Sequence, residues 1–163
     1  MKRVKIIDEA MLNALSTQAQ ASPRRRKNLN FHAQESAPAN RLLNAIEPES
    51  YVQPHRHLDA TKDETLVVLR GALGLIVFND QGHVLDRRLL RASSDAIGVD
   101  IAHGTWHTFV GIDPGSIIFE AKAGPYTALS SEEKAGWAPA EGGPGAANYL
   151  ERLRDQFRHE LAD

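Results

Sequence analysis

Two histidines separated by a single residue are the feature of the sequence most suggestive of chemistry. His55 and His57 lie in a run that continues to Glu64, and His107 follows much later in the chain. Side chains alternate across a β-strand with a period of two, so both imidazoles of a His-x-His pair point to one face. Imidazoles and carboxylates held on strands bind metal ions and leave positions open for water or substrate. The sequence therefore predicts a metal site with His55, His57, Glu64 and His107 as ligands.

The composition restricts which metal such a site would hold. The sequence contains no cysteine, which excludes thiolate ligands and disulfides. Imidazole and carboxylate together suit iron, manganese, zinc, nickel or copper, and the ligand types alone do not choose among these metals. We expect a divalent transition metal as cofactor, with iron, manganese, zinc and nickel as the main candidates.

The remaining histidines and carboxylates near the proposed ligands have simpler explanations. His103 would either line the entrance to the site or lie in an exposed loop, and we expect His83 and His159 at the surface. Asp59 and Asp63 share the loop of Glu64 and are alternatives to it as carboxylate ligand.

The bulk composition is that of one soluble globular domain. The chain has 163 residues, 42% of them hydrophobic and 25% charged, and shows no internal repeat. Its formal net charge of -2 gives no general attraction to nucleic acids or membrane surfaces. The sequence has no signal-like segment and no apolar run of about 18 residues, so we expect a cytoplasmic protein.

Short β-like runs dominate the middle of the chain. Turn sequences rich in glycine, proline, asparagine and aspartate separate most of them. About eight such runs without intervening helices predict a mainly β fold, an antiparallel sandwich or barrel. The predicted strands cover residues 41–46, 50–57, 64–69, 73–78, 84–90, 96–101, 106–112 and 116–122.

Helical patterns flank these strands. Apolar residues recur at helical spacing in residues 8–21, where Asp8 can cap the helix, and a basic stretch, residues 22–32, reads as a connecting loop. After a glycine-rich connector, whose Trp137 should pack on the barrel, a C-terminal helix carries a stripe of apolar residues that needs a surface to pack on. The stripe consists of Tyr149, Leu150, Leu153, Phe157 and Leu161.

These patterns divide the chain into three parts of one domain. Residues 1–39 would form the N-terminal helix and basic loop, residues 40–126 the β-barrel, and residues 127–163 the connector and C-terminal helix.

The proposed ligands also carry a family resemblance. The run from Ser50 to Gly71 resembles the first cupin motif, with serine in place of the first glycine and a longer gap than usual between His57 and Glu64. The six-residue gap from Glu64 to Gly71 matches the motif and favours Glu64 over the neighbouring aspartates. Residues 102–107 resemble the second motif, with alanine in place of its proline and Gly111 in place of its asparagine.

Within the cupins, the order of several short segments resembles the WbuC family of cupin-fold metalloproteins across about residues 4 to 142. The segments are residues 22–32, 41–45, 54–57, 104–107, 120–126 and 137–141. The resemblance implies a single-domain jelly-roll cupin that binds a metal and is connected with bacterial surface polysaccharides. It implies no particular reaction.

Two further groups are candidates for binding substrate or transferring protons. In the basic stretch, Arg25, Asn28, Asn30 and His32 could contact a phosphate or carboxylate, although a solvated loop is the simpler reading. Glu120 and Lys122 share one face of a predicted strand. They would be a tuned acid and base if that face lines the barrel, and an ordinary surface pair if it faces solvent.

Three functions are consistent with these residues. The leading hypothesis is a metal-dependent enzyme, an isomerase or oxygenase for example, acting on a small polar metabolite such as the sugar or sugar-nucleotide that the resemblance implies. The second is a non-catalytic module that binds metal or metabolite and regulates or assembles other proteins. The third is a metal-independent isomerase or epimerase with His107 as base. We expect a homodimer in each case, because the terminal helix and the barrel edges offer apolar surface.

Overall fold

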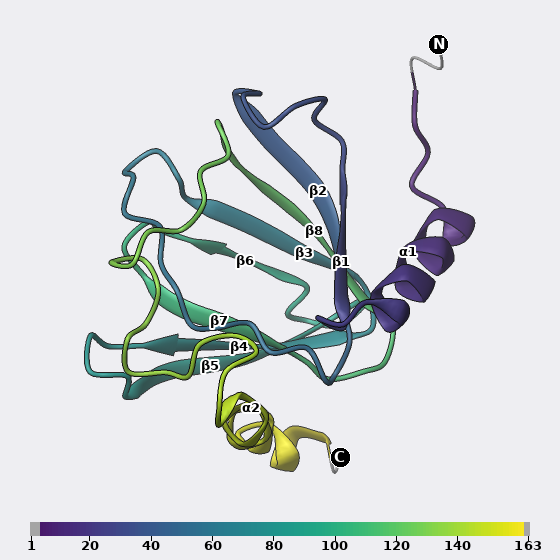
Figure 1. The fold of residues 1–163 in the computed structure, drawn as a ribbon. Coiled ribbons are helices and arrows are strands. Elements are labelled where there is room, and N and C mark those ends of the chain that lie inside the picture. The colour runs from purple at the N-terminus through teal and green to yellow at the C-terminus, as the bar shows by residue number, and fades with distance from the viewer. Residues whose placement is uncertain (1–3, 162–163) are drawn as a thin grey trace.

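Two antiparallel β-sheets packed face to face, with one helix on the outside of each, form the protein (Figure 1). The computed structural model describes residues 4–161, so the first three and last two residues of the predicted terminal parts lie outside it. The larger sheet has the order β1 (Arg26–Asn30), β2 (Ala39–Ile46), β8 (Ser116–Ala123), β3 (Glu64–Arg70) and β6 (Gly98–Ile101). The smaller sheet has the order β5 (Val84–Arg91), β4 (Ala72–Phe78) and β7 (Trp106–Gly111). The predicted mainly β class is confirmed.

The space between the sheets is filled at one end by apolar side chains from both. Alternation along each strand sends every second residue inward. On β8 the inward residues include Ile118 and on β7 Phe109, and these meet Leu73 and Leu75 of β4. The space between the two sheets therefore has an apolar end. Polar residues that also point into this space must lie at its other end.

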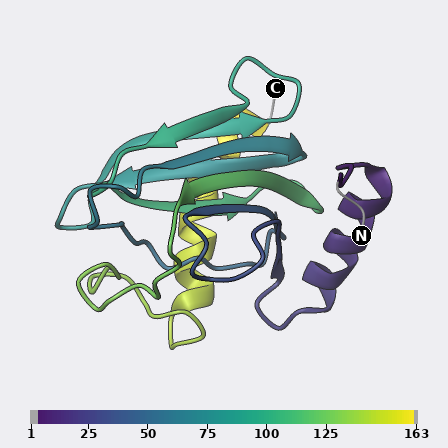
Figure 2. The same ribbon diagram turned by 90° about the horizontal axis from the view of Figure 1, so that it is seen from above.

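Helix α1 (Glu9–Ala21) covers the outer face of the larger sheet. Asp8 caps it by accepting a hydrogen bond from the backbone N–H of Met11 at 2.9 Å, as the sequence predicts. Its buried residues Leu12 and Leu15 pack on Leu43 of β2. Figure 2 shows the helix beside the sheets, away from the space between them.

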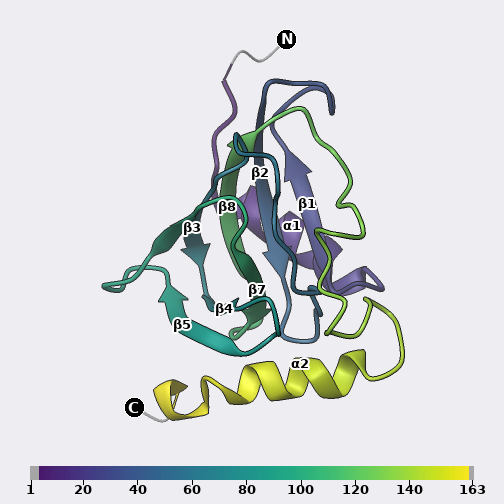
Figure 3. The same cartoon turned by 90° about the vertical axis from the view of Figure 1, so that its left-hand side faces the viewer.

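Helix α2 (Ala146–Asp155) and the short 3-10 helix η1 (Arg158–Leu161) lie beneath the smaller sheet (Figure 3). Leu150, Leu153 and Phe157 of the predicted apolar stripe are buried against this sheet, and the side chain of Leu161 lies outside the described part. Phe157 lies so close to Gly74 that a Cβ there would approach its ring to 2.3 Å. The barrel itself thus provides the surface that the stripe needs.

The connector before α2 also packs as predicted. The ring of Trp137 lies 4.9 Å from that of Phe78 and 6.1 Å from that of Trp106, between ring centroids. Within residues 4–161, no helix has the length and hydropathy required to cross a bilayer.

Two parts of the predicted secondary structure are wrong. The pattern of the basic stretch predicts a loop, but residues 26–30 form strand β1, which pairs with β2 at the edge of the larger sheet. Conversely, residues 50–57 form no strand apart from an isolated bridge at His55. Polar side chains suit an edge strand, which is why the sequence of β1 reads as a loop.

Candidate metal centre

Backbone pairing brings the two histidine motifs together. His55 and His107 exchange both backbone hydrogen bonds, each with an N–O distance of 2.9 Å, although 51 residues of chain separate them. Residues directly opposite each other in an antiparallel pair project their side chains to the same face. Their ring centroids are accordingly 4.6 Å apart, and His107 is 1% exposed.

A glycine turn ties His57 to the same place. The backbone N–H of Gly104 donates to the carbonyl of His57 at 2.7 Å, and Gly104 has a φ of +77°. Glycine adopts this conformation without the steric penalty that other residues meet. The turn thus holds the second motif against the first, with the His57 ring centroid 5.5 Å from that of His55.

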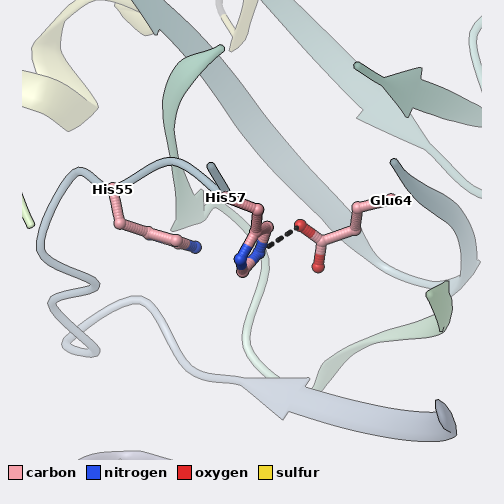
Figure 4. Close-up of side chains that lie close together, drawn as sticks. All are labelled: His55, His57 and Glu64. Atoms are coloured by element: carbon pink, nitrogen blue, oxygen red, sulfur yellow. Dashed lines mark ion pairs between the residues drawn. The ribbon is translucent and has the colours of Figure 1, made fainter. Parts of the chain in front are cut away.

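Glu64, the first residue of β3, supplies a carboxylate to the three imidazoles. It is 4% exposed, and its Oε2 lies 3.4 Å from His57 Nε2 and 3.5 Å from His107 Nε2. Donor atoms of His55, His57 and Glu64 all lie within 4.8 Å of one another (Figure 4). His107 adjoins this group through its contact with Glu64 rather than belonging to it.

The donor atoms suit a metal ion. Nδ1 of His55 lies 3.1 Å from the carbonyl of Gln53, and Nδ1 of His107 lies 2.9 Å from that of Thr105. A carbonyl can only accept, so each Nδ1 carries the proton and each Nε2 offers a lone pair, as metal-binding histidines do. Glu64 Oε2 and His107 Nε2 are buried without a hydrogen-bond partner among the described residues. When each metal–ligand bond is about 2.1 Å long, two ligand atoms on the same ion lie roughly 3.0 to 4.2 Å apart. The distances from Glu64 Oε2 to Nε2 of His57 and of His107, 3.4 and 3.5 Å, fall in this range.

Burial and neighbouring charges set the protonation of this cluster. Burial, followed by the neighbouring His107, lowers the pKa of His55 to about 3, which keeps its ring neutral and able to bind metal. Burial alone would raise the pKa of Glu64, but its close contacts with His107 and His57 and the charge of Lys122 hold it well below its usual value. The cluster therefore presents an ionised carboxylate at Glu64 and a neutral imidazole at His55.

The face shared by Glu120 and Lys122 lines the space between the sheets and does not face solvent. Lys122 Nζ lies 3.1 Å from Glu120 Oε1, 3.4 Å from Glu64 Oε1 and 3.3 Å from His57 Nε2. Burial and then the charge of Glu64 raise the pKa of Glu120 to about 8. Burial opposes the charge of Lys122, but Glu120 and Glu64 outweigh it and raise its pKa. These two residues thus form an acid–base pair in contact with the proposed ligands.

The substrate-binding residues predicted from the basic stretch lie elsewhere. Arg25 pairs with Glu49 at 3.4 Å, and His32 contacts backbone of Arg41. The side chains of Asn28 and Asn30 are exposed on β1. None of these four residues lines the cavities beside the histidines.

The alternative carboxylates and the neighbouring histidine are also outside the cluster. Asp59 accepts hydrogen bonds from Thr61 within its own turn, and Asp63 pairs with His103 at 2.8 Å on the surface. His83 and His159 are exposed, as expected. Glu64 is therefore the carboxylate that faces the imidazoles.

Two small cavities, of about 170 and 120 Å³, adjoin His55. Beside Glu64, Lys122 and the histidines, they are lined by Arg26 of the basic stretch, whose cluster of basic side chains is a candidate for binding phosphate or carboxylate, and by three polar residues that the sequence patterns did not indicate. These three residues are Asn40, Asn44 and Lys62. The alternation of side chains along the strand places Asn40 and Asn44 on one face, and this pattern could have indicated that both face the site. The position of Lys62 depends on a loop, which has no such pattern.

Comparison with known sequences places the chain in a family. The model of a domain of unknown function, DUF6016, matches residues 7–90, about half of the chain. The chain belongs to this family. None of the curated proteins matches the DUF6016 chain.

Solved structures show which fold this DUF6016 protein has. It resembles KdgF from Halomonas sp. at 17% identity and a TM-score of 0.50, over 65% of this chain and 84% of that one. It also resembles oxalate oxidase in complex with the substrate analogue glycolate, at 14% identity and a TM-score of 0.53, over 86% and 76% of the chains. A conserved protein of unknown function from Streptococcus pyogenes, SPY1581, matches at 7% identity and a TM-score of 0.52, over 78% and 93%. The DUF6016 protein thus has the cupin fold predicted from its motifs.

Proposed function

We propose that the protein binds one divalent transition metal through His55, His57, Glu64 and His107, and that it is a metal-dependent enzyme acting on a small polar metabolite. The observation that carries this proposal is the convergence of three imidazoles and one buried carboxylate, with donor atoms of Glu64 and His107 that have no other partner. Leaving buried polar atoms unpaired is costly, and a metal ion would remove that cost.

The protein's own residues would share the remaining work. The ion would act as a Lewis acid or activate a bound water or dioxygen. Glu120, whose pKa lies near neutrality, can hold or release a proton beside the site, and Lys122 keeps that proton position fixed through its contact at 3.1 Å. The apolar end of the barrel, including Phe109 and Ile118, excludes bulk water from this pair.

The size of the cavities bears on the substrate. Cavities of about 170 and 120 Å³ are smaller than the range of about 300–1,000 Å³ typical of drug-sized ligands. The resemblance to the WbuC family suggests a sugar or sugar-nucleotide of surface-polysaccharide metabolism. A sugar-sized group fits the cavity better than a complete sugar-nucleotide, whose nucleotide would lie outside it.

Metal analysis tests the proposal. We expect about one equivalent of metal in protein purified without added metal, and a loss of most of it in His55→Ala and in His107→Ala. His83→Ala and His159→Ala replace exposed histidines and serve as matched controls that keep full metal. Full metal in both ligand variants would contradict the proposal.

A second measurement separates the enzyme from a non-catalytic module and from a metal-independent isomerase. Manganese-loaded protein should enhance water proton relaxation, because four protein ligands leave positions open for water. A fully coordinated ion without exchangeable water would favour the module. Turnover that survives complete chelation would favour the isomerase with His107 as base.

A further inference from the structure

Beside the histidines, the cavity of about 170 Å³ has a wall of polar groups that the proposed metal ligands do not use. Its lining includes Asn40, Lys62 and Lys122, next to His55 and His57. Tyr126, which is half exposed, lies at its rim. Any molecule that coordinates the metal from this cavity must contact that wall.

Asn40 is placed there by the register of the larger sheet. It lies directly opposite Lys122 on β8, and Lys122 lies directly opposite Glu64 on β3. The three side chains therefore form one row across the inner face of the sheet. Asn40 is 3% exposed, and its Oδ1 is buried with no hydrogen-bond partner among the described residues. Buried polar atoms normally have a partner, and a ligand in the cavity would interact with this amide. An oxyanion is bound with the amide group turned by 180°, so that Nδ2 rather than Oδ1 faces it and donates.

Lys62 adds a buried positive charge. It is 8% exposed, and its Nζ donates to the carbonyl of Pro125 at 2.6 Å. Within residues 4–161, no carboxylate lies within 4.0 Å of this ammonium group, although it forms part of a largely buried cavity wall. An ammonium has three N–H donors, so two remain after the bond to Pro125. A buried charge normally has a counter-charge in direct contact, and among the described residues only the exposed Asp59, beyond 4.0 Å, interacts with the charge of Lys62.

The summed charge of the site also favours an anionic ligand. The charge of Lys122 is balanced by that of Glu64, at 3.4 Å. A divalent ion at the histidines would add two positive charges to that of Lys62. The occupied site would then be strongly positive and would attract an anion.

We propose that this cavity is a subsite for an oxyanion group of the substrate, a carboxylate or a phosphate, held by Lys62 and Asn40 on the side away from the metal. This inference rests on the proposed metal function and adds a property of the substrate to it: an anionic group, which a neutral sugar lacks. Ammonium groups and amide N–H groups both donate hydrogen bonds to such oxygens. Lys122 then separates the oxyanion from the metal and fixes the register of the substrate between them.

Calorimetric titration with two probes, malonate and inorganic phosphate, tests the subsite. We expect metal-loaded protein to bind at least one probe, and Lys62→Gln to bind it at least about tenfold more weakly, because a charged hydrogen bond is lost. Lys27→Gln removes an exposed lysine of β1 and should bind as the unmodified protein does. The stronger of the two probes assigns the group as carboxylate or phosphate. Absence of binding for both probes, or unchanged affinity in Lys62→Gln, would overturn the inference.

Asn40→Asp provides an independent variant should Lys62→Gln fold poorly. The new carboxylate has nearly the same shape as the amide, but its negative charge in the cavity wall would repel the anionic probe, so we expect at least about tenfold weaker binding. Unchanged affinity in this variant would also overturn the subsite.

The two proposals fail separately in these experiments. Metal content is measured on the same samples, and Lys62→Gln should keep its metal because Lys62 is not a ligand. If the protein takes up no metal but still binds a probe in a way that depends on Lys62, the subsite is supported and the metal proposal is contradicted. If the protein holds its full metal content but binds neither probe, the metal proposal is supported and the subsite is contradicted.

Discussion

At the scale of single residues, the orientation of each ring matters as much as its position. Backbone carbonyls of Gln53 and Thr105 accept from Nδ1 of His55 and His107, so each ring keeps its lone pair on Nε2, and Nε2 of His107 lies 3.5 Å from Glu64 Oε2. Such hydrogen bonds fix the tautomer and orient the ligand before metal arrives. The site is therefore prepared by the main chain, and its specificity for a cation comes from the buried carboxylate.

Replacing that carboxylate separates Glu64 from its sequence neighbour. Glu64→Gln should weaken metal binding by more than the roughly 10–100-fold typical of losing an outer-shell partner, because a charged ligand is lost. Asp63→Asn should leave the affinity unchanged, since Asp63 pairs with His103 on the surface. Competition with a coloured chelator measures both constants. Equal losses in the two variants would contradict the assignment of Glu64.

At the scale of elements, the sheets bring the ligands together by register and the helices hold the sheets. Cross-strand pairs align Asn40, Lys122 and Glu64 in one row, while α1 and α2 cover the outer faces. Small changes at a helix–sheet contact should therefore affect the stability of the whole barrel.

The contact between α2 and β4 gives a quantitative case. Phe157→Ala should cost about 3–5 kcal/mol in the free energy of unfolding by leaving a cavity. Gly74→Ala should cost about 1–3 kcal/mol, because its Cβ would approach the Phe157 ring to 2.3 Å. In the double variant the new methyl fills part of the cavity, so the two losses should not add. Urea unfolding measures all four proteins, and strict additivity would show that the contact is absent.

An ion-pair cluster links β1 to the connector and gives the stability a pH dependence. Burial alone would raise the pKa of Glu141, but hydrogen bonds from Arg24 and Arg26 hold it below its usual value. A lowered carboxyl pKa stabilises the folded state above the unfolded value of about 4.3, and this stability is lost as the pH falls through the folded pKa.

Glu141→Gln should therefore cost about 1–2 kcal/mol at pH 7, since one third of the side chain stays in solvent and water screens the pair. The difference from the unmodified protein should shrink as the pH falls from about 5 toward 2. Glu49→Gln removes an exposed pair with Arg25 and should have little effect at any pH. Thermal unfolding of the three proteins across this pH range measures these differences in stability. A difference between Glu141→Gln and the unmodified protein that does not change with pH would refute the ion-pair explanation.

At the scale of the molecule, the sequence predicted the architecture better than the contents of its cavity. Turn residues and alternation indicated most of the strands, and motif spacing brought together His55, His57, Glu64 and His107. Strand β1 was missed because its residues are polar, and an edge strand needs few apolar residues. Lys62 was missed because its burial depends on Pro125, 63 residues away, and no local pattern indicates such a contact.

Dimerisation remains a prediction, and the structure changes where it should occur. The apolar face of α2 is covered by its own sheet, but β5 is an edge strand on which Leu85 is 65% exposed and Val84 is also exposed. We expect a dimer by light scattering, and a shift to monomer in Leu85→Lys. A monomer at all concentrations would contradict this expectation.

The metal site is tested most directly by a crystal structure of metal-loaded protein with anomalous diffraction at the absorption edge of the bound metal. We expect one strong anomalous peak bounded by Nε2 of the three histidines and the carboxylate of Glu64, at about 2.0–2.2 Å from each ligand atom. A peak at any other position, or no peak among these four residues, would contradict the proposed site.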